Sequence, residues 1–152
     1  MTLALDIDAI KHSLGRWDAD PPASGLHARR LSLALAEQHL SAGYDVIVGQ
    51  YLPRTPFIED LAALAERHHQ RLFEFVLDID AGTLSDRLAR RTSGPNRPEH
   101  VVNNRLVVPA DASRLIESME ALRHMRPDAI WIDARGSLSS TLDLLRATLV
   151  EA

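Results

Sequence analysis

The sequence predicts an α/β protein with a mostly parallel sheet. Short apolar runs of strand length alternate with longer segments in which apolar residues recur at helical spacing. The strands are apolar at successive positions, as is typical of parallel strands covered on both faces by helices. A length of 152 residues suits a single domain, residues 1–152, with one core.

Composition excludes several classes of protein. Apolar residues make up 45% and charged residues 25%, which excludes a disordered or fibrous chain. The sequence lacks the ~20 uninterrupted apolar residues of a membrane span, and residues 1–6 do not resemble a secretory signal. There is no cysteine, and the net charge of −4 argues against general nucleic-acid binding. We therefore expect a soluble cytoplasmic protein with no membrane partner.

Four apolar runs are predicted to form the strands, and the first ends in Asp6 and Asp8. The runs are residues 3–7, 45–48, 72–79 and 129–133.

Capping residues mark the predicted helices. Ser24 is expected to begin the first long helix and Gly43 to end it. Thr55 with Pro56 is a typical helix start, and Asp80 is interpreted mainly as the cap of the next helix.

The second half continues this pattern. Residues 92–100 contain two prolines and a glycine, which predicts a loop. A helix is expected over 112–124, and Pro127 falls in the segment that ends it. Ser140 and Asp143 form a predicted capping box for the last helix.

The predicted strands end in polar residues. Parallel α/β sheets bind ligands at the carboxyl ends of their strands, so these side chains are the first candidates for a site. For Asp8 the sequence pattern fits a functional carboxylate and a helix cap equally well. The strand-end side chains are Asp6, Asp8, Gln50, Tyr51, Arg54, Asp78, Asp80, Asp133 and Arg135.

The run Leu-Asp-Ile-Asp-Ala-Ile-Lys at 5–11, followed by Leu14-Gly15, resembles the second strand of small P-loop kinases. That branch contains polynucleotide, gluconate and zeta-toxin-like kinases and is related to AAA-family ATPases. Residues 45–48, 75–78, 84–91 and 128–133 are similar to its later strands and its arginine-bearing lid. The resemblance implies a three-layer sandwich with a mostly parallel sheet, and ATP and Mg²⁺ as cofactors.

The defining motif of that superfamily, G-x-x-x-x-G-K-[ST], is absent from this sequence. In the superfamily it follows the central strand of a sheet ordered 2-3-1-4-5, so the central strand is missing here. Either the chain is truncated at its N-terminus, which we favour, or it is a variant that lost phosphate binding. Residues 3–7 are expected to pair with 45–48, and 72–79 with 129–133. A continuous four-stranded ladder would contradict truncation, and a second copy of the chain is one candidate to fill the gap.

The resemblance also implies roles for individual residues. Asp8 would orient the attacking hydroxyl, and an arginine-rich lid over about residues 84–108 would close on the nucleotide. Gly49-Gln50 stands where many members have an acidic residue, and no residue is assigned to a metal. The catalytic candidates are Asp8, Arg87 and Arg91; the substrate-binding candidates are Asp6, Lys11, Arg16, Gln50 and Arg54; the nucleotide and lid candidates are Arg90, Arg97 and Arg135.

The sequence leads to two hypotheses about function. The first is an ATP-dependent kinase acting on a hydroxyl of a small molecule or polynucleotide end, inactive as these 152 residues because the phosphate-binding loop is absent. The second is a non-catalytic nucleotide- or protein-binding module on a degenerate kinase scaffold.

Overall fold

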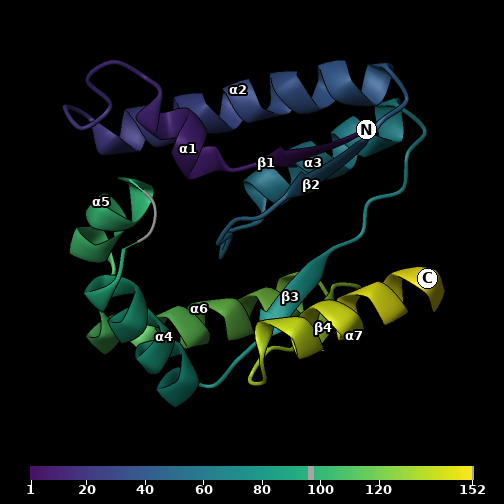
Figure 1. The fold of residues 1–152 in the computed structure, drawn as a ribbon. Coiled ribbons are helices and arrows are strands. Elements are labelled where there is room, and N and C mark those ends of the chain that lie inside the picture. The colour runs from purple at the N-terminus through teal and green to yellow at the C-terminus, as the bar shows by residue number, and fades with distance from the viewer. Residues whose placement is uncertain (96–97, 152) are drawn as a thin grey trace. The chain divides into compact units, whose positions relative to one another are not determined.

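The computed structural model describes residues 1–95 and 98–151. The chain divides into two compact units, Met1–Leu72 and the segment from Phe73 onward. Each unit contains a pair of parallel strands and its own helices (Figure 1). The α/β class predicted from the sequence is therefore confirmed.

The first unit pairs its two strands in parallel. β1 (Thr2–Leu5) lies beside β2 (Asp45–Val48), with Thr2 opposite Asp45 and Leu5 opposite Val48. Between them in sequence come α1 (Ile7–His12) and the long helix α2 (Pro21–Ser41), and α3 (Pro56–Arg67) follows β2. In Figure 1, α2 runs along the strand pair.

Two groups of buried residues hold this unit together. Leu5 of β1, Ala36 of α2 and Leu64 of α3 form one group, so the strand pair and both long helices share a core. Ile7 of α1, Ala28 of α2 and Phe57 of α3 form the other group, so these three helices share a second part of the core. The small side chains Ala28 and Ala36 are at most 1% exposed, which lets α2 approach its neighbours closely.

The second unit repeats the parallel pair. β3 (Phe75–Asp78) lies beside β4 (Ile130–Asp133), with Phe75 opposite Ile130 and Asp78 opposite Asp133. The connection contains α4 (Ala81–Ser93), α5 (Pro98–Leu106), a 3₁₀ turn (Pro109–Asp111) and α6 (Ala112–Met125). α7 (Leu138–Glu151) follows β4. The buried side chains of this unit include Val76, Leu88, Ala112, Leu115, Leu122 and Ile132.

The strand pairing predicted from the sequence is confirmed. Among the described residues the four strands form two separate two-stranded sheets, one joining β1 to β2 and one joining β3 to β4. β2 has the predicted bounds, whereas β1, β3 and β4 are shorter than predicted. Ile47 and Leu77 are 61% and 54% exposed, so the expectation that both faces of every strand are buried is wrong at these positions.

Several predicted helix starts are corrected by the structure. Asp20, not Ser24, caps α2, because its carboxylate accepts the Ala23 amide at 3.1 Å and Pro21 and Pro22 occupy the first turn. The last helix begins at Leu138 rather than at Ser140, and the Ser137 hydroxyl accepts the Ser140 amide at 3.1 Å.

The predicted loop over 92–100 is also partly wrong. α4 extends through Ser93, and α5 begins at Pro98, where proline is favoured because the first helical position needs no amide hydrogen. The other termini agree with the sequence. Gly43 follows the end of α2 with a φ of 79°, Pro56 begins α3, and Asp80 caps α4.

Candidate functional site

The carboxyl end of β1 leads directly into α1. Asp6 caps this helix, and its Oδ1 accepts the amides of Asp8 at 3.0 Å and Ala9 at 3.1 Å. Asp8 and Lys11 lie three positions apart on α1 and so occupy the same side of the helix. Asp6, predicted to bind substrate, therefore has a structural task as a cap, whereas Asp8 sits in the first turn of the helix.

Lys11 lies close to an aromatic side chain of the next loop. Its Nζ is 5.1 Å from the centre of the Trp17 ring, and the His12 ring meets the same indole edge-on at 4.3 Å. A cation over an indole face is attracted by the negative charge of the ring face. The chain's single lysine thus helps to fix Trp17 in place.

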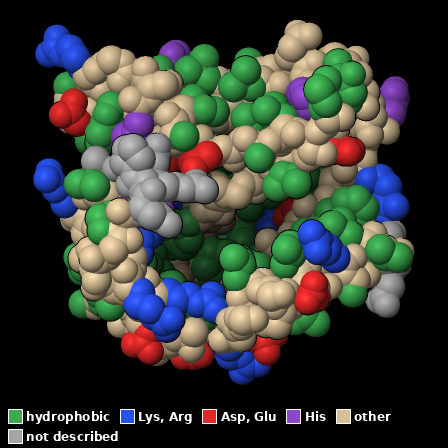
Figure 2. All heavy atoms as spheres, in the orientation of Figure 1, with side chains coloured by type: hydrophobic (Ala, Val, Ile, Leu, Met, Phe, Trp, Pro, Cys, Tyr) green, Lys and Arg blue, Asp and Glu red, His purple; other side chains and the backbone are tan. Residues whose placement is uncertain are grey.

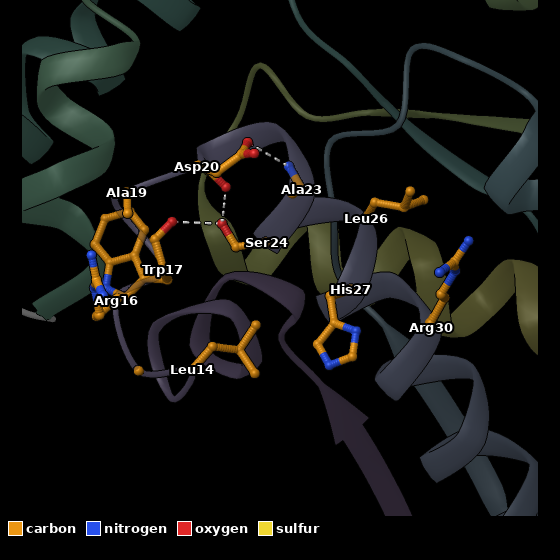
Figure 3. Close-up of a pocket in the computed structure, with 11 residues that line it drawn as sticks. Leu14, Arg16, Trp17, Ala19, Asp20, Ala23, Ser24, Leu26, His27 and Arg30 are labelled. Atoms are coloured by element: carbon orange, nitrogen blue, oxygen red, sulfur yellow. Dashed lines mark hydrogen bonds between the residues drawn. The ribbon is translucent and has the colours of Figure 1, made fainter.

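A hollow of about 580 Å³ opens between the segment 14–20 and the first turns of α2. We call it the α1–α2 hollow. Arg16, predicted to bind substrate, lines it together with Trp17, Leu26, His27 and Arg30 (Figure 3). Neither His27 nor Arg30 was identified from the sequence, because α2 was predicted to begin later and its amino-terminal turns were not assigned a face.

The other two substrate candidates follow β2. Gln50 is half-buried and Arg54 is exposed, and both belong to the segment that connects β2 to α3. Neither residue lines the α1–α2 hollow. The structure therefore brings Arg16 into a hollow but leaves Gln50 and Arg54 outside it.

In the second unit, Arg87 binds the chain's own backbone. Its Nη2 donates hydrogen bonds to the carbonyl oxygens of Ala134 at 2.6 Å and Gly136 at 2.8 Å. These carbonyls belong to the loop between β4 and α7. Arg87, predicted as catalytic, thus fixes this loop to α4.

Arg91 contacts the next helix. Its Nε donates to Oδ1 of Asn104 at 2.8 Å, and Nδ2 of the Asn104 side chain donates back to the Arg91 backbone carbonyl at 3.3 Å. This pair of bonds joins α4 to α5, so the segment predicted as a lid contains two helices that are fastened together. Arg90 is exposed on α4, and Arg97 lies outside the described residues.

Asp133, the last residue of β4, forms an ion pair with Arg135, two residues later. Asp133 accepts hydrogen bonds from Nε and Nη2 of Arg135 at 2.9 and 2.8 Å. These bonds and the Arg135 amide lower the pKa of Asp133 to about 2. The same pairing raises the pKa of Arg135, so both groups are charged at neutral pH.

Asp80, at the end of β3, behaves as the sequence predicted. Its carboxylate accepts the amide of Thr83 at 2.8 Å and the Thr83 hydroxyl at 2.7 Å. These bonds lower the pKa of Asp80 and satisfy the first turn of α4. The carboxylate is therefore committed to capping.

The described parts of the chain contain neither a metal-binding group of three side chains nor a membrane-spanning helix. Within residues 1–95 and 98–151, no three Asp, Glu or His side chains form a group that would hold a metal ion. Over the same ranges no helix is both long and apolar enough to span a membrane. On the face shown in Figure 2, Lys and Arg side chains occur in several separate groups.

Comparison with known proteins gives no match. No family model matches the chain, and no curated protein or solved structure matches it either.

Proposed function

We propose that this chain is part of an ATP-dependent phosphotransferase of the P-loop kinase class, acting on a hydroxyl of a small molecule or polynucleotide end. The observation that carries the proposal is the strand pairing. A sheet ordered 2-3-1-4-5 that lacks strand 1 has strands 2 and 3 paired, and separately strands 4 and 5. The parallel pairs β1–β2 and β3–β4 have this arrangement.

The acceptor side of the proposed reaction is assigned to the start of α1. Asp8 follows the carboxyl end of β1, where ligands of parallel α/β sheets bind. A carboxylate within hydrogen-bond distance of a hydroxyl aligns it for attack and accepts its proton. Lys11, on the same side of the helix, would lie beside an anionic part of the acceptor.

The phosphate-binding loop would have to come from outside these 152 residues. ATP needs backbone amides and a lysine to hold its phosphates, and the sequence contains no glycine-rich loop of that kind. The 152 residues therefore lack the groups that would hold the phosphates of ATP.

The second candidate is a non-catalytic binding module on the same scaffold. The bonding of two predicted catalytic arginines favours it, because Arg87 is bound to backbone carbonyls and Arg91 to Asn104. An arginine that must reach a transferring phosphoryl group would first have to leave these partners. Under this alternative the two arginines are structural.

The test compares nucleotide binding by two proteins. The 152-residue chain with ATP and Mg²⁺ should show no rise in melting temperature. A protein extended with the residues encoded in frame upstream should bind ATP, provided that they include a glycine-rich loop. If the upstream frame encodes no such loop, the kinase proposal fails.

Phosphoryl transfer by the extended protein separates the two candidates, and a variant tests the role of Asp8. Asp8→Asn should lower the rate of phosphoryl transfer by ~10²-fold or more while ATP binding persists, since it removes the proposed base. Asp18→Asn, on the exposed loop that follows, is the matched control and should leave the rate unchanged. An extended protein that binds ATP but transfers no phosphate would favour the binding module.

A further inference from the structure

The α1–α2 hollow carries an inference that does not depend on phosphoryl transfer. Its volume of about 580 Å³ falls within the ~300–1,000 Å³ typical of small-molecule sites. Its lining mixes apolar side chains, Leu14, Trp17 and Leu26, with two guanidinium groups. Half of the Leu26 side chain is exposed, so an organic ligand would find apolar surface there.

Positive charge lies at both ends of the hollow. In Figure 3, Arg16 lies at one end beside Trp17, Arg30 lies at the other, and His27 lies between them. The one acid in the lining, Asp20, directs its Oδ1 at the Ala23 amide, 3.1 Å away, as the cap of α2. The lining therefore has a net positive charge within a chain whose net charge is −4.

The loop that forms one wall is firmly held. The Ser24 hydroxyl lies 2.6 Å from the carbonyl oxygen of Trp17 and 2.7 Å from that of Asp20, and so ties the loop to α2. Lys11 and His12 contact the Trp17 ring from α1. A wall fixed on two sides loses little conformational entropy when a ligand binds.

Arg16 has an unusual backbone. Its φ is 58°, in the left-handed region that residues other than glycine rarely adopt. Such a conformation persists only where the surrounding structure enforces it, and it is common where a side chain must be aimed at a ligand. Arg16, the residue with this backbone conformation, is one of those that line the hollow.

We propose that the α1–α2 hollow binds an elongated organic dianion, with one anionic group at Arg16, the other at Arg30, and the apolar body against Trp17 and Leu26. Guanidinium forks pair with carboxylate and phosphate alike, so either group satisfies the proposal. A ligand with a single anionic end would leave one arginine without its partner. We therefore expect the hollow to favour a ligand that carries an anionic group at each end.

The test is calorimetric titration of the 152-residue protein with linear α,ω-dicarboxylates from glutarate to sebacate. One chain length should bind best, and it should bind about tenfold more tightly than the monocarboxylate of equal length. The diol of equal length should not bind. The alkane bisphosphate of the best length shows whether phosphate or carboxylate is preferred, and binding of either supports the proposal.

Variants locate the binding. Arg16→Gln and Arg30→Gln should each weaken the best dianion by about tenfold, since each removes one charge-assisted contact. Arg29→Gln is the matched control, because Arg29 is exposed on the same helix but does not line the hollow. The indole N–H NMR signal of Trp17 should shift on titration, and Trp131→Phe assigns the two tryptophan signals.

Three results would overturn the proposal. The first is that no member of the series binds. The second is that the monocarboxylate binds as tightly as the best dianion, which would remove the need for two arginines. The third is that Arg29→Gln weakens binding as much as Arg30→Gln, which would mean general attraction to surface charge.

Discussion

Arg87 illustrates how one side chain can fix a loop that is distant in sequence. Its guanidinium donates to the carbonyl oxygens of Ala134 and Gly136, 47 and 49 residues away. Both carbonyls lie in the loop between β4 and α7, and Nη2 of Arg87 can donate to both because it carries two N–H groups. At this scale, the geometry of donors and acceptors decides what an arginine does.

Replacing Arg87 with glutamine should lower the free energy of unfolding by about 1–3 kcal/mol, because two carbonyl groups lose their donor. Urea unfolding followed by circular dichroism measures this change. Arg90→Gln is the control on the same helix, where the exposed side chain predicts an effect within about 0.5 kcal/mol. Equal effects of the two variants would contradict a structural role for Arg87.

The Asp133–Arg135 pair predicts a pH dependence. The pKa of Asp133 falls from 3.8 to about 2, chiefly through the Arg135 side chain and amide, so folding favours the charged carboxylate. Its stabilising contribution is complete above pH 3.8 and is lost as the pH falls toward 2.

Asp133→Asn removes that contribution at every pH. The urea midpoint of the variant should lie below that of the parent at pH 6, and the difference should shrink toward zero as the pH approaches 2. The effect should be small, because the two side chains are 51% and 62% exposed. A difference that grows on acidification would contradict the assigned pairing.

At the scale of the elements, glycine has opposite effects on stability inside α2 and just beyond its end. Gly25 lies within α2 with no atom within 4 Å of the place a Cβ would occupy. Gly43 follows the end of the same helix with a φ of 79°. Glycine is unfavourable in a helix interior but suits the left-handed residue that ends one.

Gly25→Ala should therefore stabilise the protein by about 0.5–1 kcal/mol, since the unfolded chain loses freedom and nothing is displaced. Gly43→Ala should destabilise it by about 1–2 kcal/mol, since a Cβ is strained in the left-handed conformation. Thermal unfolding of the two variants beside the parent measures both changes. Changes of the same sign would contradict the assigned end of α2.

The sequence predicts most of the elements because their signals are local. The alternation of apolar runs with segments of helical spacing predicted the four strands, and Asp80, Pro56 and Gly43 marked helix ends correctly. The pairing of the strands was implied by the resemblance to P-loop kinases and not by these local signals. The candidate site was less predictable. Asp6 was assigned to substrate although it caps α1, since a strand-end carboxylate and a helix cap have the same sequence pattern.

For the whole molecule, the main feature is that the described strands form two pairs rather than one sheet. In a parallel pair, backbone amides alternate between the side facing the partner and the opposite side. In β4 the amide of Ile130 donates to Glu74 at 2.8 Å, and the amide of Ala134, just past the strand, donates to Asp78 at 2.8 Å. The amides of Trp131 and Asp133 therefore face away from β3.

Amide exchange tests this arrangement. Ile130 and Ala134 should exchange at least about tenfold more slowly than Trp131 and Asp133, because the first two amides are bonded across the sheet. NMR exchange of the 152-residue protein in dilute solution measures the four rates. Protection of Trp131 and Asp133 equal to that of their neighbours would mean that another strand, from the same or a second chain, completes the sheet.

The sequence by itself determined the order of the elements and the residues that begin and end several of them. These follow from signals that lie within a few residues of each other, or from the hydrophobicity of whole segments. The tertiary structure alone decided that Arg87 binds the 134–136 loop and that Arg16 and Arg30 line one hollow. Such contacts depend on how loops and helices pack, because side chains far apart in sequence meet only after the backbone between them has folded.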